Sequence, residues 1–425
     1  MRRFVLIALV LVLALILISA GTAWYLANDE AFLKSQLSKV VLNQTGRELA
    51  VDGPLQLEIG RQTSIEASGI RFQNAAWAEQ PDMVRVGRLA VTIDIPSLWD
   101  ETIIIPELSI EDCSIDLLKN ENGEANWDVL PESEPDPEPP PPRTAMPVQG
   151  NHIRISNCSL GLDAPDRERP LRLSIDDLEM KLQDETRWQG DGAGTINSED
   201  FAFSGWYGPV GAFYLGKPVE HELQLGLGDV TLESSGTVED PSAFSGANIQ
   251  ARFSGPDIGK ILHEFSAPPV SEGAFDFRLQ LDSKGEMTTI DLNGDLGSLE
   301  ARASGELDRF KDTQKGHLKA TVDGPNLAAL AQALGVPGLV SDGFKLQADA
   351  SFSEGVTTVK SAVLETSMDR VSISGDLGSG ADLANTALDI DLTSDEIGRW
   401  MPALNQEPKN IGPIKLEGSL ASDPE

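Results

Sequence analysis

Apolar residues alternate with polar residues along most of the chain beyond Glu48. This period of two is the pattern of a β-strand with one apolar face and one wet face. The clearest alternating apolar sets are Leu55, Leu57 and Ile59; Leu89, Val91, Ile93 and Ile95; Phe275, Phe277, Leu279 and Leu281; and Leu388, Ile390 and Leu392. Glycines and Asp-Gly or Asn-Gly pairs between such runs are typical of hairpin turns. The pattern predicts a mostly β protein built on antiparallel sheet.

The first residues depart from this pattern. Residues 4–27 form an uncharged, almost wholly apolar run, and a helix of about 20 residues spans the hydrocarbon core of a bilayer. Two arginines precede the run, and Asp29 and Glu30 follow it, so the positive-inside rule predicts a single-pass transmembrane helix with a cytoplasmic N-terminus. A cleaved signal peptide, cut near the small residues between Ser19 and Ala23, is the alternative. The apolar run continues past those residues, which favours an anchor, and either interpretation exports the remaining chain.

One short helix is predicted directly after the anchor. Asn28 or Asp29 can cap its N-terminus, and Gly46 can end it. Its apolar stripe has helical spacing and comprises Phe32, Leu33, Leu37, Val40 and Val41. We expect this helix to cap the first open edge of the sheet. A membrane-surface helix is the alternative, but the stripe is short and the polar face is not strongly basic.

A proline-rich acidic stretch between Pro131 and Pro147 separates two copies of one pattern. Proline cannot donate to a strand ladder and like charges repel, so we expect a disordered or extended linker. The residues 108–117 match residues 153–162 position by position, and in both copies the apolar phase slips after an Asp-Cys or Asn-Cys pair, which suggests a bulge or bend. The linker would then join neighbouring strands and bring Cys113 close to Cys158. A disulfide between them and two separate buried thiols are both open alternatives.

A second repeat fills the C-terminal half, with a period of about 70 residues. Its markers are the Gly-Pro-Asp-Ile sequence at 255–258, the Gly-Pro-Asn-Leu sequence at 324–327, the Asp-Glu-Ile sequence at 395–397, and the glycine sets Gly236, Gly305, Gly375 and Gly273, Gly343, Gly412. We expect the first glycine set to end three similar strands, and a short helix, such as 327–334, to follow each Gly-Pro element. The third copy stops soon after its first strand, so we expect a partial repeat or a fragment.

These patterns divide the chain into five parts. The predicted parts are an anchor at 1–27, an N-terminal β domain with its capping helix at 28–130, the linker at 131–147, further β structure at 148–235, and β repeats with short helices between them at 236–425.

Composition excludes several kinds of function. The chain has 33 Lys and Arg against 67 Asp and Glu, and its net charge of −34 disfavours nucleic acid and anionic membrane surfaces as partners of the body. Four scattered histidines and two cysteines have no metal-site spacing, so we expect no metal and no cofactor. The stretch from Gly255 to Lys260 resembles a phosphate-binding loop, but it is short and Ile261 replaces the required Ser or Thr. We expect no enzyme.

Four segments resemble the AsmA-like family of bacterial envelope proteins. They are residues 45–49 (TGREL), 52–55 (DGPL), 69–75 (GIRFQNA) and, most specifically, 122–127 (NGEANW), and the resemblance covers residues 1 to about 130. It implies kinship with repeating-β-groove, bridge-like lipid transfer proteins. In those proteins an elongated, curled sheet lined with apolar side chains carries phospholipids between the inner and outer membranes. Other members of the family are linked to outer-membrane protein assembly and lipopolysaccharide levels.

The expected function follows from the resemblance together with the alternation. We expect a protein of the bacterial inner membrane, with most of the chain in the periplasm, whose apolar groove carries phospholipids toward the outer membrane. An outer-membrane or periplasmic protein would complete the path. The alternating residues named first are the candidate groove lining. The main alternative is an envelope assembly factor that binds proteins and whose sheets close into sandwiches. A hydrolase would instead need a cleft with converging carboxylates.

Overall fold

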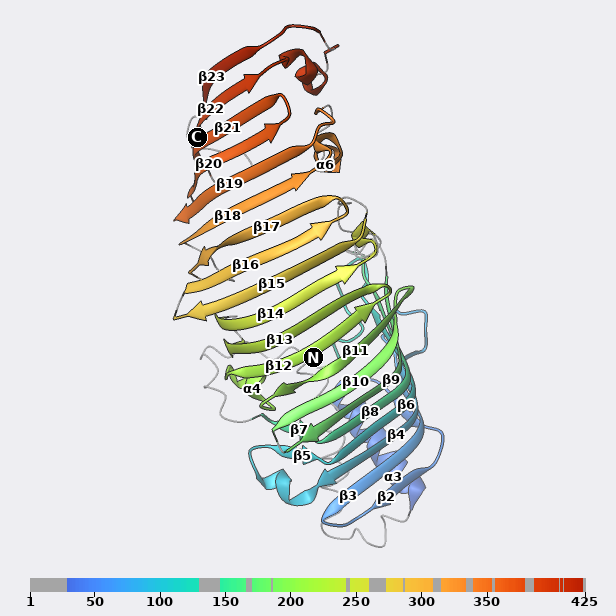
Figure 1. Cartoon of the computed structure of the whole chain (residues 1–425). Coiled ribbons are helices and arrows are strands. Elements are labelled where there is room, and N and C mark those ends of the chain that lie inside the picture. The colour runs from blue at the N-terminus through green and yellow to red at the C-terminus, as the bar shows by residue number, and fades with distance from the viewer. Residues whose placement is uncertain are drawn as a thin grey trace. The chain divides into compact units, whose positions relative to one another are not determined.

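The computed structural model (Figure 1) describes residues 29–129, 146–165, 170–184, 186–241, 245–259, 273–285, 287–308, 315–333, 339–353, 356–378, 386–404, 406–407 and 409–422. The expected anchor and most of the expected linker lie outside these residues. Within them, none of the helices combines the length and the apolar character that a membrane span requires. The chain divides into two compact units, the first ending at Leu215 and the second beginning at Gly216. The sequence pattern instead predicts that the repeats begin at residue 236, about 20 residues after this division.

The first unit is built on one sheet. Its strands are β1 (Leu49–Val51), β2 (Leu55–Glu58), β3 (Gln62–Gln73), β4 (Asp82–Asp94), β6 (Glu107–Leu118), β8 (His152–Asp163), β9 (Leu171–Gln183), β10 (Arg187–Ile196) and β11 (Glu199–Gly208). Strands β1 and β2 both pair with β3, and the pairing then runs β3–β4–β6–β8–β9–β10–β11. The expected antiparallel sheet is confirmed except between β6 and β8, which are parallel. A crossover that includes the linker joins these two strands, as parallel pairing requires.

Four shorter elements flank this sheet. Strand β5 (Ile103–Ile105) pairs in parallel with β7 (Val148–Gly150), while η1 (Ile95–Trp99) is a 3-10 helix and α4 (Ala212–Leu215) is one helical turn. The peptide N–H of Ile103 also donates to the carbonyl of Pro147, so the end of the linker region lies beside β5.

The capping helix α3 (Glu30–Thr45) has the predicted limits. The Asp29 carboxylate accepts a hydrogen bond from the N–H of Phe32 at 3.1 Å, and Gly46 ends the helix with φ 68°. The buried side chains of α3 pack on one face of β1 to β4, in a core that comprises Leu33, Leu37, Val41, Leu49, Leu55, Ile65, Ala67, Val91 and Ile93. The helix therefore covers a sheet face more than the edge. At the edge, the Glu30 carboxylate accepts a hydrogen bond from the N–H of Leu55 in β2 at 3.2 Å.

A crease crosses the first unit from β3 to β9. In each of the strands β3, β4, β6, β8 and β9, one residue has no partner in the strand pairing. Each of these unpaired residues lies opposite the one in the next strand, and they are Gly69, Gly87, Asp112, Asn157 and Asp176. Asp112 and Asn157 have left-handed backbones, with φ 56° and 51°, a conformation that Gly, Asn and Asp tolerate best. The predicted bend at the Asp-Cys and Asn-Cys pairs is confirmed. It keeps the apolar residues on one face although their spacing in the sequence slips.

The second unit is an antiparallel meander in which each strand pairs with the next. Its strands are β12 (Val219–Leu227), β13 (Val230–Asp240), β14 (Ser245–Gly255), β15 (Phe275–Lys284), β16 (Met287–Leu296), β17 (Leu299–Leu307), β18 (Lys315–Gly324), β19 (Phe344–Ser353), β20 (Val356–Thr366), β21 (Asp369–Leu377), β22 (Ala387–Ser394) and β23 (Ile414–Ala421). The helix α6 (Leu327–Ala333) follows β18, and the 3-10 helix η2 (Ile397–Leu404) follows β22.

Each full repeat comprises four strands. The connection between the second and third strands of a repeat contains the α-helix α6 after β18 and the 3-10 helix η2 after β22. Gly236, Gly305 and Gly375 occupy equivalent positions inside β13, β17 and β21, so the prediction that they end strands is wrong. A Cβ atom on these glycines would lie 2.0, 2.0 and 2.1 Å from a backbone oxygen of the next strand. Glycine is therefore required at this position in all three copies. The Gly-Pro elements follow β14 and β18, and the predicted helix after the second one is confirmed.

Candidate functional site: the apolar sheet face

One face of the second unit is apolar across all of its strands. Register pairing aligns side chains of successive strands into rows that cross the sheet. The first row reads Leu225, Leu232, Phe253, Phe277, Gly294, Ala301, Val322, Leu346, Leu364, Val371, Leu392 and Leu416. The next row reads Leu223, Ser234, Ala251, Leu279, Leu292, Ala303, Ala320, Ala348, Ala362, Ile373, Ile390 and Gly418. Neither row contains a charged residue.

Small side chains form the middle of this face. Ala303, Ala320, Ala348 and Ala362 follow one another on four adjacent strands. All four are only partly buried, so no other described segment covers them fully. Bulky β-branched or aromatic residues usually occupy such positions in a sheet, because they fill space against a packed layer. Alanines in a row leave room above the sheet for another apolar group.

Helical elements cover one end of the strands in the second unit. Leu327 of α6 lies in a buried cluster with Val340 and Phe344, against which Trp400 of η2 also packs. The guanidinium of Arg399 in η2 pairs with the Asp342 carboxylate at 2.5 Å. The pKa of Asp342 is lowered chiefly by its hydrogen bond from Arg399 and next by that from Ser367. This end of the apolar face is therefore closed by packing and an ion pair, while the alanine row is not.

A hydrogen-bonded polar pair lies on the apolar face near its first strand. The imidazole Nε2 of His221 lies 2.8 Å from the hydroxyl of Ser234. Burial lowers the pKa of His221, which favours its neutral form. A neutral imidazole that is hydrogen-bonded to a hydroxyl fits an apolar face, so this pair adds no charge to it.

The first unit presents a similar apolar face. One of its rows reads Leu55, Ala67, Leu89, Ile110, Ile155, Leu178, Gly192 and Phe203. Helix α3 covers the beginning of this face. On β10 the inward positions are glycines, and a Cβ on Gly190 would lie 2.0 Å from the sulfur of Met180 in the next strand. Side chains of the neighbouring strands thus lie over β10.

The structure places most of the predicted groove residues on these two faces. Phe275, Phe277, Leu279, Leu281, Leu388, Ile390 and Leu392 lie on the apolar face of the second unit, and Leu57 and Leu89 lie on that of the first. Leu55, Val91 and Ile93 lie under α3 and are core residues. Ile59 and Ile95 do not continue their strands, because β2 ends at Glu58 and β4 ends at Asp94. The alternation pattern does not reveal the alanine row, because alanine is only weakly apolar and also occurs at polar positions.

The opposite face of each sheet is charged and wet. In the second unit Arg252 donates to both oxygens of Asp276, at 3.0 and 2.9 Å, and this lowers the pKa of Asp276. In the first unit hydrogen bonds from Lys181 and then His152 lower the pKa of Glu179 to about 2. These pairs are exposed, so each contributes little to stability. Among the described residues no group of His, Cys, Asp and Glu has the geometry of a metal site.

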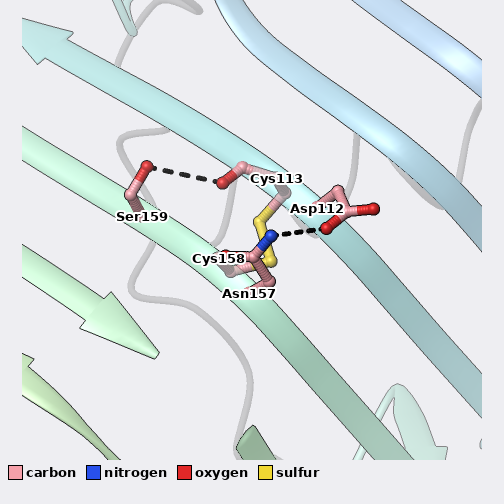
Figure 2. Close-up of a disulfide and its surroundings, with 5 residues drawn as sticks. All are labelled: Asp112, Cys113, Asn157, Cys158 and Ser159. Atoms are coloured by element: carbon pink, nitrogen blue, oxygen red, sulfur yellow. Dashed lines mark hydrogen bonds between the residues drawn. A yellow bond between two sulfur atoms is a disulfide. The ribbon is translucent and has the colours of Figure 1, made fainter. Parts of the chain in front are cut away.

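A disulfide joins the two copies of the duplicated pattern (Figure 2). Residues 108–118 of β6 pair in parallel with residues 153–163 of β8, and Cys113 lies opposite Cys158 with their Cα atoms 4.4 Å apart. The amide of Asn157 donates to the carboxylate of Asp112 beside the bond, so the two residues with left-handed backbones also contact each other. The bond lies at the crease and encloses the linker in its loop.

Three of the four segments that carry the family resemblance meet at one buried residue. Asn126 is fully buried, and its amide nitrogen donates to Asn74 Oδ1 at 2.9 Å and to the Asp116 carbonyl at 2.7 Å. Its amide oxygen accepts from the N–H of Leu118 at 2.8 Å, and its backbone carbonyl accepts from Arg47. Three motifs distant in the sequence therefore form one hydrogen-bonded cluster, which holds the segment before the linker against the sheet.

The sequence model of the AsmA family matches residues 1–202. This part of the chain is AsmA-like. The match confirms the predicted resemblance and extends it past the linker into β11. It indicates an envelope-related function for the AsmA-like part. No curated protein and no solved structure compared with the chain matches it.

Proposed function

We propose that this chain is an inner-membrane-anchored periplasmic protein whose apolar sheet faces carry the acyl chains of phospholipids toward the outer membrane. The observation that carries the proposal is the alanine row Ala303, Ala320, Ala348 and Ala362, an uncharged and partly exposed strip on an apolar face. Contiguous apolar surface of this kind is rare on a protein that has no apolar ligand.

The free energy of acyl-chain exposure supports the proposal. A phospholipid with about 30 methylenes would cost on the order of 24 kcal/mol to expose to water, at ~0.8 kcal/mol per methylene. A lipid crossing an aqueous compartment therefore needs apolar surface along its whole path. The rows of the second unit offer such surface from β12 to β23, and the charged opposite face suits an aqueous surrounding. Both properties agree with the envelope-related function of the AsmA-like part.

A second candidate is an envelope assembly factor that binds proteins. It is favoured by strand β23, whose apolar side chains Leu416 and Leu420 are 50% and 55% exposed. Exposed apolar side chains of this kind can contact another protein. On this account the apolar rows would contact a protein partner.

Crosslinking in cells distinguishes the two candidates. Photo-reactive residues would be placed at Phe277 and Leu279 on the apolar face of the full chain, and at Arg278 and Gln280 on the wet face as matched controls. We expect phospholipid adducts at Phe277 and Leu279 and none at the controls. Protein adducts at the apolar positions would support the assembly factor. Equal lipid labelling of both faces would contradict the proposed function.

A further inference from the structure

Two large apolar side chains are exposed on adjacent loops at one end of the first unit. Trp99, at the end of η1, is 79% exposed, and Ile59, in the turn between β2 and β3, is 51% exposed. The loops adjoin, because the N–H of Ile95 donates to the carbonyl of Arg61 at 2.9 Å. Neither side chain belongs to the apolar sheet face, so the proposed lipid path does not account for them.

The loop that carries Trp99 is held in place by buried groups. The Ser97 hydroxyl donates to the carbonyl of Asp94 at 2.6 Å and accepts from the N–H of Ile104 at 2.8 Å. Ser97 is buried, and Leu98 packs against the core beneath α3. Trp99 is therefore exposed on a loop whose position is fixed, because the neighbouring Leu98 packs into the core.

Chain connectivity places these loops near the start of the described chain. The Glu30 carboxylate, in the first turn of α3, accepts from the N–H of Leu55 at 3.2 Å. Ile59 lies four residues beyond Leu55, which limits their separation to about 14 Å. The apolar run at residues 4–27 directly precedes α3 in the sequence. If that run is the anchor, as the proposed function holds, the bilayer surface lies close to Ile59.

We propose that Trp99 and Ile59 form a membrane-contact surface that rests in the headgroup region of the bilayer holding the anchor. Tryptophan favours this region because its ring is apolar while its N–H is a hydrogen-bond donor. The side chain of Arg61 lies beside them, 3.9 Å from the Asp94 carboxylate, and because it is 83% exposed it can also reach a lipid phosphate. Asp100 and Glu101 follow Trp99, so the contact is confined to the headgroup level. It would hold the first strands of the sheet beside the bilayer surface, where lipid enters.

Site-directed fluorescence tests this contact in the full chain in phosphatidylcholine nanodiscs. Cys113 and Cys158 are joined to each other, so a single introduced cysteine can be labelled with an environment-sensitive dye. The test positions are Trp99→Cys and Ile59→Cys. The matched control is Trp77→Cys, an apolar residue that is 40% exposed in the loop between β3 and β4. This loop lies at the opposite end of β3 from the turn that carries Ile59, and the 12 residues of β3 separate the two.

We expect nitroxide-labelled lipids to quench the dyes at positions 99 and 59 at least threefold more than the dye at 77. Equal quenching at all three positions would overturn the membrane contact. So would a chain that does not enter nanodiscs, since the anchor would then be absent. The crosslinking at Phe277 and Leu279 is independent of this result, so failure of the contact and failure of the lipid path are distinguishable.

Discussion

At the scale of single residues, the cluster around Asn126 shows why its motif is specific. The side chain satisfies the N–H of Leu118 and the carbonyl of Asp116, two backbone groups of β6, and contacts Asn74 beyond β3. A buried backbone group without a partner costs free energy, so this asparagine substitutes for a missing strand partner. An amide side chain suits this position because it donates and accepts hydrogen bonds at the same time.

Replacing Asn126 with alanine is expected to lower the free energy of unfolding of the first unit by about 2–4 kcal/mol, because buried polar groups would lose their partners. Denaturant unfolding followed by tryptophan fluorescence measures the change. The matched control is Asn122→Ala in the exposed turn of the same motif, which should change the unfolding free energy by under about 0.5 kcal/mol. Similar losses in both variants would refute the role assigned to Asn126.

The sequence reveals this motif but not its partners. The resemblance singles out residues 45–49, 69–75 and 122–127 as separate segments. Nothing in local pattern tells that Arg47, Asn74 and Asn126 meet, since contacts between distant segments depend on the folded sheet. In contrast, the cap at Asp29 and the stop at Gly46 are local, and both are predictable from residue type alone.

At the scale of elements, the repeat glycines set how closely neighbouring strands pack. A Cβ on Gly305 of β17 would lie 2.0 Å from the carbonyl oxygen of His317 in β18. Gly418 of β23 offers a matched comparison, because it lies on the same apolar face and nothing lies within 4 Å of its Cβ position.

Gly305→Ala is therefore expected to destabilise the second unit by about 1–3 kcal/mol, since the strands must move apart. Gly418→Ala should have no destabilising effect. Thermal unfolding followed by circular dichroism compares the two variants. If both melt at the temperature of the native chain, the glycine positions do not constrain strand packing.

The disulfide acts on the pairing of β6 and β8. Its loop of 45 residues predicts a stabilisation of up to about 4 kcal/mol through the entropy of the unfolded chain. The double variant Cys113→Ala and Cys158→Ala should show this loss in denaturant unfolding. A reducing agent should bring the native chain to the same midpoint and leave the variant unchanged. Identical midpoints for the oxidised native chain and the variant would contradict a stabilising disulfide.

Alternation predicts the strands better than their ends or partners. It identifies β15 and β22 because their apolar residues face one side without interruption. It extends too far at Ile59 and Ile95, where apolar residues continue past the last paired residue. It also leaves open the parallel pairing of β6 and β8, because a pattern of period two is the same for parallel and antiparallel neighbours. Matching copies such as 108–117 and 153–162 are the one sequence feature that points to the pairing.

At the scale of the whole molecule, both compact units follow the same plan of one apolar face and one charged face. The sequence predicts this plan through alternation together with acidity. It does not predict which stretches of the apolar face are covered, because α3, α6 and η2 cover some rows and leave others partly exposed. The alanine row becomes visible only when register aligns residues from four strands.

The most direct test of a lipid-carrying face is the amount of phospholipid that purifies with the full chain. Ala303→Trp and Ala320→Trp place a large ring in the alanine row, whereas Ser304→Trp places the same ring on the wet face of β17. Mass spectrometry of extracted lipid gives the phospholipid bound per chain, and residues 1–27, which are the same in every variant, contribute equally to each value. We predict at least a twofold loss of phospholipid in the two alanine variants and none in Ser304→Trp. Equal phospholipid in all three variants and the native chain would contradict the account.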